Sequence, residues 1–254
     1  MRLHRLLDHE FDAQKLDAWL AEGDDPNATH GEIDETPQHV AVRRRRLEAL
    51  DPLLAAGAAI DARTRGGKSA WVHAYRRGFD EICEALAERG AVCEPNDADQ
   101  LAALLTQRRI DEAQALLERE PELARSTNPE EARVLPDVVG YDRLESCRLL
   151  LDHGAEIAAR GLDGGTALHV TAWFGAPHCT ELLIERGAPL ELRCVDHDLT
   201  PLGWAAHGSQ YSGAADERQE VYVEIVERLL QAGAVIEPGV AAMASPQVQQ
   251  LLRR

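Results

Sequence analysis

Apolar residues recur along this chain at helical spacing, in short stretches separated by turn residues. The clearest case runs from Thr166 to Ala188, where two apolar stretches follow each other. Thr166 can cap the first stretch at its N-terminal end, and Gly175 can close it. The second stretch begins near Pro177, where proline suits the first helical position. We therefore predict a pair of short helices here.

The same pair of stretches recurs along the chain at an almost constant interval. The turns that end the second helices align at Gly23, Gly57, Gly90, Glu120, Gly154, Gly187 and Gly233, with separations of 34, 33, 30, 34, 33 and 46. All of these positions except Glu120 are glycine, which suits the positive φ of a helix C-cap. A period near 33 residues fits a turn and two helices. The pattern predicts a stack of helix pairs.

Two short motifs give the repeat a family resemblance. Thr166-Ala167-Leu168-His169 and Thr36-Pro37-Gln38-His39 are similar to the Thr-Pro-Leu-His signature of ankyrin repeats, and Leu183 to Ala188 nearly keeps the Leu-Leu-x-x-Gly-Ala ending. The chain thus resembles the ankyrin repeat family. The resemblance implies an all-α solenoid of about seven helix-pair repeats, with short β-turn tips and terminal capping helices.

We expect one ankyrin-repeat domain over residues 1–254. Residues 1–28 are polar on the leading helix and are assigned as an N-terminal capping repeat, and residues 238–254 as a C-terminal cap. Repeats fill residues 29–237. The last interval is longer than the others, which places an insertion near residues 209–220, between the two helices of one repeat.

The composition favours a soluble helical protein. The chain has 254 residues with 44% hydrophobic and 4% aromatic content, which suits close-packed small helices. No apolar run approaches the roughly 20 residues needed to span a bilayer, and the first residues carry acids and histidines where a signal peptide needs an apolar stretch. We expect a cytoplasmic protein with reduced thiols, since its five cysteines are scattered.

The net charge limits the partners. A formal charge of −17 argues against general affinity for nucleic acid or an anionic membrane, because both require clustered positive charge. Lysine occurs only at Lys15 and Lys68, so nearly all basic groups are guanidinium, which suits bidentate contact with carboxylates. This arginine-rich, alanine-rich composition resembles a GC-rich bacterial coding sequence.

The resemblance also implies which residues contact a partner, because ankyrin repeats bind mainly through first-helix positions and hairpin tips. Carried over to this sequence, these positions form a basic set and an aromatic set. They are Arg43, Arg44, Arg65, Lys68, Arg76 and Arg77, followed by Tyr141, Trp173, Phe174, Trp204 and His207. The expected partner is another protein with an acidic and apolar surface. The alternative is that the arginines pair with acids of the same chain and that Trp173 packs on Trp204 or His207.

The leading hypothesis is a non-catalytic protein-interaction scaffold that holds its partner in the concave ankyrin groove. A stoichiometric inhibitor or toxin-neutralising immunity protein is an alternative within that class. A more remote alternative is a metal-dependent enzyme or small-molecule binder around His178, Cys194, His197 and His207. Because a single Cys-x-x-His pair falls short of a zinc site, we predict no catalytic residue, metal or cofactor.

Overall fold

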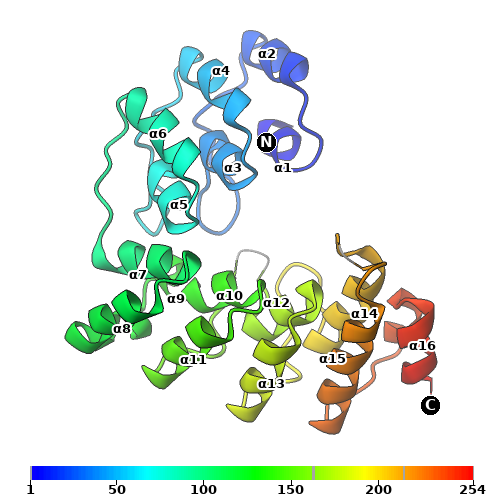
Figure 1. Cartoon of the computed structure of the whole chain (residues 1–254). Coiled ribbons are helices and arrows are strands. Elements are labelled where there is room, and N and C mark those ends of the chain that lie inside the picture. Colours follow the sequence, from blue (N-terminus) through cyan, green and yellow to red (C-terminus); the bar gives the residue numbers. More distant parts are fainter. Residues whose placement is uncertain (1, 162–163, 214, 254) are drawn as a thin grey trace. The chain divides into compact units, whose positions relative to one another are not determined.

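The computed structural model describes residues 2–161, 164–213 and 215–253, and every regular element in these ranges is a helix (Figure 1). The chain forms two compact units, Met1–Gln107 (unit 1) and Arg108–Arg254 (unit 2). Within the described ranges, none of the helices has both the length and the apolar character needed to cross a membrane. The expected single domain over residues 1–254 stays a prediction.

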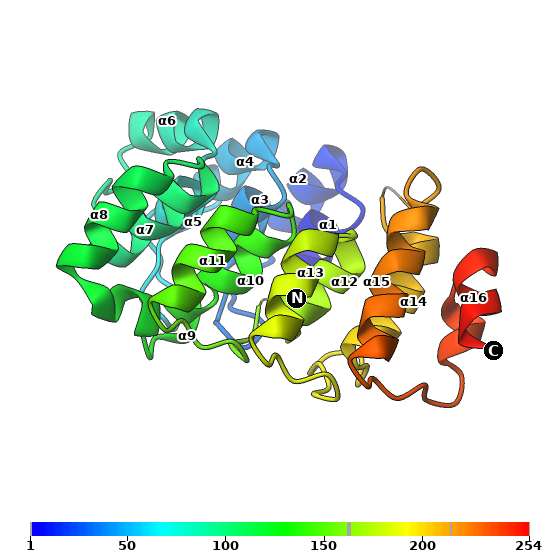
Figure 2. The ribbon, with the colours of Figure 1, turned by 60° about the horizontal axis from the view of Figure 1, so that its bottom comes forward.

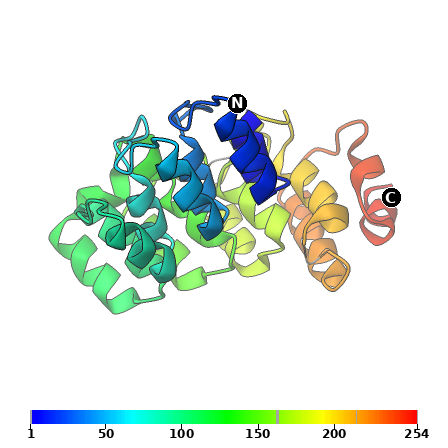
Figure 3. The same ribbon diagram turned by 90° about the horizontal axis from the view of Figure 1, so that it is seen from above.

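Unit 1 consists of helix pairs joined by short turns. Its helices are α1 (Arg2–Asp8), α2 (Ala13–Ala21), α3 (Pro37–Arg43), the 3-10 turn η1 (Leu47–Ala49), α4 (Leu50–Ala55), α5 (Ala70–Arg76), α6 (Asp80–Glu88) and α7 (Asp97–Thr106). The first helices α1, α3, α5 and α7 pack in a row, and α2 packs on α4 in a second row (Figure 1; Figure 3 gives the view from above). Each pair thus buries its apolar stripes between two layers.

Unit 2 continues the same pattern. Its helices are α8 (Ile110–Arg119), η2 (Pro121–Arg125), α9 (Pro129–Ala132), α10 (Val134–Val139), α11 (Leu144–Asp152), α12 (Ala167–Phe174), α13 (Pro177–Glu185), α14 (Pro201–Tyr211), α15 (Gln219–Gln231), η3 (Val240–Met243) and α16 (Pro246–Leu252). Helices α10, α12 and α14 pack in one row, and α8, α11, α13 and α15 in another (Figure 2). Helix α16 packs on α15 at the end of the row.

The Thr-x-x-His signature ties consecutive repeats together. Nδ1 of His169 lies 2.9 Å from Thr166 Oγ1 at the start of α12, and its Nε2 lies 3.1 Å from the Leu199 carbonyl oxygen in the next repeat. His39 makes the same contacts with Thr36 and with the Lys68 carbonyl oxygen. The predicted turn tips also form: single antiparallel bridges join residues 30 and 35, 63 and 69, and 160 and 166.

Part of the predicted insertion is helical. Helix α14 has 11 residues where α12 has 8, and α15 has 13 where α13 has 9. The connection between α14 and α15 is residues 212–218, whereas α12 and α13 are separated by residues 175–176. Residue 214 lies outside the described part of the insertion. The extra length therefore extends both helices as well as the loop, which sequence spacing alone does not reveal.

Candidate functional site

The ends of the first helices in unit 2 carry a row of aromatic rings, which we call the aromatic ridge: Tyr141, Trp173, Phe174, His207 and Tyr211. The rings of Trp173 and His207 have centroids 5.3 Å apart, and those of His207 and Tyr211 4.7 Å apart. A β-carbon built at Gly140 would lie 3.1 Å from Cδ2 of Phe174, so that ring covers the backbone beside Tyr141. The rings of Trp173, His207 and Tyr211 are thus in sequence, and Phe174 lies against Gly140, the neighbour of Tyr141.

Much of the ridge is open to solvent. The exposed fractions are 74% for Tyr141, 51% for Phe174 and 60% for Tyr211, whereas Trp173 is half-buried. Large aromatic side chains lose a favourable burial free energy when they face water, so a group of them on one surface marks a contact site. Tyr211 was missed in the sequence because it falls in the stretch assigned to the insertion. Tyr211 follows His207 by four residues, and if the helix is extended to Tyr211 this spacing places both rings on the same helix face.

The insertion supports the ridge from behind. The Arg218 guanidinium donates to the carbonyl oxygens of Phe174 (3.1 Å) and Gly175 (2.6 Å), which are free acceptors at the end of α12. The Tyr222 hydroxyl donates to the Trp173 carbonyl oxygen at 2.7 Å. These bonds fix the end of α12 and still leave the Phe174 ring half exposed. Arg218 in the insertion and Tyr222 in α15 therefore position the ridge, and the Phe174 ring remains exposed.

Trp204 is a correction to the predicted contact set. It is only 7% exposed, and its indole Nε1 donates to Cys194 Sγ at 3.2 Å. Its ring meets the rings of His169 and Trp173, with centroids 5.4 and 6.1 Å apart. Trp204 therefore fills the space between two repeats, and the expectation that it lies on a contact surface is wrong. The alternative that Trp173 packs on Trp204 or His207 is confirmed, since the Trp173 ring contacts both.

The arginines of unit 1 are largely paired with acids of the same unit. Arg43 lies 2.9 Å from Asp8 and 3.3 Å from Glu35, and Arg44 lies 2.7 Å from Asp8. Burial opposes the charge on Arg43, yet Glu35 and Asp8 raise its pKa above the usual value. Arg65 is exposed and lies 3.1 Å from Asp34. Intramolecular pairing, the alternative set out from the sequence, is therefore present at these three residues.

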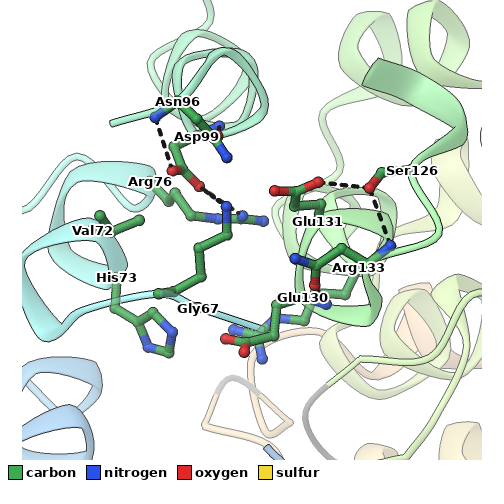
Figure 4. Close-up of polar contacts among 12 residues, drawn as sticks. Gly67, Val72, His73, Arg76, Asn96, Asp99, Ser126, Glu130, Glu131 and Arg133 are labelled. Carbon is green, nitrogen blue, oxygen red and sulfur yellow. Dashed lines mark hydrogen bonds and ion pairs between the residues drawn. The ribbon is translucent and has the colours of Figure 1, made fainter. Parts of the chain in front are cut away.

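Lys68 and Arg76 are a second correction, because their side chains are only 4% exposed. Lys68 Nζ and Arg76 Nη1 lie 2.9 and 3.1 Å from the same carboxylate oxygen of Asp99 (Figure 4). Asp99 also accepts from the Asn96 backbone N–H at the start of α7. A buried carboxylate needs such partners. The expectation that Lys68 and Arg76 lie on an exposed tip and groove is therefore wrong. Arg77, half-buried, donates to the His73 carbonyl oxygen.

The residues weighed for a metal site have other partners. Cys194 Sγ accepts from the indole of Trp204 and from the Leu199 backbone N–H, and His178 Nδ1 lies 2.6 Å from Asp142. His197 is exposed on the hairpin. Over the described part of the chain, no three His, Cys, Asp or Glu side chains come together in a way that could hold a metal ion.

Comparison with known families identifies the central repeats of unit 2. Residues 135–184 match the family model for ankyrin repeats, described as many copies. This segment contains nearly all of α10 to α13, and with them Tyr141, Trp173 and Phe174 of the aromatic ridge.

Two known proteins are similar in sequence to parts of this chain. "SH3 and multiple ankyrin repeat domains protein 2" of Homo sapiens is 28% identical over 201 residues, which cover 75% of this chain and 10% of that protein. "Protein PhlB" of Serratia liquefaciens is 41% identical over 61 residues, 24% of this chain and 27% of that protein. The chain therefore spans about a tenth and a quarter of the length of these relatives.

Two solved structures are similar to the chain. The ankyrin repeat domain of Bcl-3 is 23% identical, with a TM-score of 0.38 and coverage of 80% of this chain and 92% of that chain. The human ASB11 ankyrin repeat domain is 20% identical, with a TM-score of 0.38 and coverage of 100% and 98%.

Proposed function

The chain is an ankyrin repeat protein, and from this premise we propose that it is a non-catalytic scaffold that binds a protein partner on the aromatic ridge of unit 2. Ankyrin repeats are in general protein–protein interaction modules, and their stacked pairs present extended binding surfaces. The observation that carries the proposal is the exposure of Tyr141, Phe174 and Tyr211 along one row of first-helix ends.

The ridge has the properties of a binding hot spot. Aromatic side chains contribute most to interfaces when they are rigid before binding, because little conformational entropy is then lost. Trp173 packs between Trp204 and His207, and the hydrogen bonds of Arg218 and Tyr222 fix the backbone at the end of α12. The exposed Phe174 ring thus sits on a preorganised support.

The partner is expected to combine apolar and acidic groups. Apolar groups would cover the exposed rings of the ridge. In unit 1, Arg44 and Arg65 keep 45% and 68% of their side chains exposed, although each already pairs with an acid of this chain. Such arginines favour an acidic partner through long-range attraction, which changes the association rate more than the affinity.

Affinity capture from the native host, followed by mass spectrometry, tests this proposal. The wild-type chain is compared with a variant that carries Tyr141→Ala, Phe174→Ala and Tyr211→Ala. We expect the variant to lose the captured partner, because it removes the exposed rings and keeps the supporting bonds to backbone atoms. Val235→Ala is the matched control, since Val235 is 58% exposed and lies outside the ridge.

Circular dichroism and thermal melting of each variant show whether the fold is kept. Loss of the same partner by the Val235→Ala protein would mean that the capture does not report on the ridge. Undiminished capture by a folded ridge variant would contradict the proposed function.

A further inference from the structure

The turn between the two helices of a repeat has one recurring backbone conformation. The residue immediately before the N-cap of each of these second helices has a left-handed backbone. Its φ is 66° at Gly78, 61° at Arg108, 53° at Asp142 and 68° at Gly175. Glycine takes this conformation without cost, and a β-carbon makes it unfavourable. Arg108 therefore occupies a position at which the same fold elsewhere uses glycine, and its side chain projects from a fixed point at the start of α8.

A second arginine lies at the start of the neighbouring helix. Arg143 is the N-cap residue of α11, which packs beside α8. The guanidinium carbon of Arg143 lies 4.8 Å from the centre of the Tyr141 ring, at one end of the aromatic ridge. Burial lowers the pKa of Arg143, and the charge of Arg108 lowers it further. Arg108 precedes the N-cap of α8 and Arg143 is the N-cap of α11, and these two helices pack side by side.

Neither cation is neutralised within the described residues. Arg109, the neighbour of Arg108, pairs with Glu112, and Asp142, the neighbour of Arg143, accepts from His178 Nδ1 and the Cys179 backbone N–H. Among residues 2–161, 164–213 and 215–253, no carboxylate forms an ion pair with Arg108 or Arg143. Arg45, whose backbone is also left-handed, differs in having an acidic partner, because its guanidinium lies 3.9 Å from Glu81.

We propose that Arg108 and Arg143 form an anion site that holds a carboxylate of the partner, while an apolar side chain next to that carboxylate packs on Tyr141 and Phe174. The occupant is an acidic segment of a protein, in which Asp or Glu lies near a large apolar residue. This inference rests on the proposed function and specifies the chemistry of the partner at one end of the ridge.

Three physical reasons support this occupant. Guanidinium groups bind carboxylates through short, charge-assisted hydrogen bonds. A carboxylate held by both arginines neutralises their charge, and the half-buried Arg143 gains a counter-charge. The Phe174 ring lies against Gly140, the neighbour of Tyr141, and the Arg143 guanidinium lies over the Tyr141 ring, so the apolar and the anionic contacts are next to each other.

The test is a selection of random peptides of about twelve residues displayed on phage, with the full chain as bait. We expect the selected peptides to share an Asp or Glu next to an aromatic or large aliphatic residue. One selected peptide is then synthesised together with a copy in which each acid is replaced by Gln or Asn. The acidic peptide should bind at least about tenfold more tightly than its neutral copy, as charged hydrogen bonds imply.

Variants locate the contact on the protein. Arg143→Gln and Arg108→Gly should each lower the affinity for the acidic peptide by roughly tenfold. The affinity for the neutral copy should stay unchanged. Arg148→Ala is the matched control, because Arg148 is exposed on the same helix and away from its start. It should bind both peptides as the wild-type chain does.

The outcomes separate this inference from the proposed function. The anion site would be overturned if the selected peptides lacked acids. It would also be overturned if the arginine variants lost the same affinity for the acidic and for the neutral peptide. The scaffold proposal would survive if Phe174→Ala still abolished binding of those peptides. Peptides that bind the ridge variant as well as the wild-type chain would overturn both.

Discussion

Gly208 of α14 lies directly against the backbone of Trp173 in α12: a β-carbon at Gly208 would come within 2.8 Å of the Trp173 carbonyl oxygen. The same carbonyl oxygen accepts the hydrogen bond from Tyr222. The close approach of these two helices therefore fixes the middle of the aromatic ridge.

Gly208→Ala should destabilise the protein by about 1–3 kcal/mol, because the added methyl group meets backbone atoms that cannot move without separating α12 from α14. Chemical denaturation measures the change in the free energy of unfolding. Gly213→Ala is the control, since a β-carbon there meets nothing within 4 Å. Equal stability of the two variants would show that the helices do not approach as closely as described.

Two substitutions at Arg108 test the left-handed turn. Both Arg108→Gly and Arg108→Ala remove the guanidinium, but only glycine adopts a φ of 61° without strain. We expect the glycine variant to be more stable than the alanine variant by about 1 kcal/mol, measured by urea unfolding. The reverse order would contradict the assigned turn.

His169 makes stability depend on pH. Burial lowers the pKa of this histidine from its ordinary value of 6.5 to about 4. As the pH falls from 6.5 to 4, the unfolded chain takes up a proton at this residue before the folded chain does, so stability is lost across this window. The loss should approach about 3 kcal/mol at the lower end. His169→Gln should flatten the pH dependence of the unfolding free energy in this range, whereas Val235→Ala, which removes no titratable group from an exposed position, should leave the slope unchanged.

His178 should titrate above the ordinary histidine range. The Asp142 carboxylate, 2.6 Å from Nδ1, raises the pKa of this exposed imidazole through a hydrogen bond and its charge. A titration followed by NMR should show this, and Asp142→Asn should lower the pKa of His178. An unchanged midpoint in that variant would mean that the pair does not form in solution.

Local chemistry explains why much of the fold could be predicted. Gly175 adopts a φ of 68° and closes α12, α13 begins at Pro177, and Gly187 adopts a φ of 79°, all as the sequence indicated. These features depend on the conformational preferences of single residues and on apolar spacing within one helix. The histidines of the two signature motifs follow the same local rule, since His39 and His169 each bond to a Thr three residues earlier and to a backbone carbonyl of the next turn.

The sequence by itself thus determined the helix pairs and the residues that begin and end their helices, because these follow from short-range periodicity and from the preferences of single residues. Only the tertiary structure decided which side chains remain available. Lys68 pairs with Asp99 and Arg44 with Asp8, and Tyr222 donates a hydrogen bond to the Trp173 carbonyl oxygen. The two partners in each contact are far apart in the sequence. Charge pairing and burial depend on which distant residue packs alongside, and that information is absent from the local pattern. The exposure of Phe174 and the burial of Trp204 were settled in the same way.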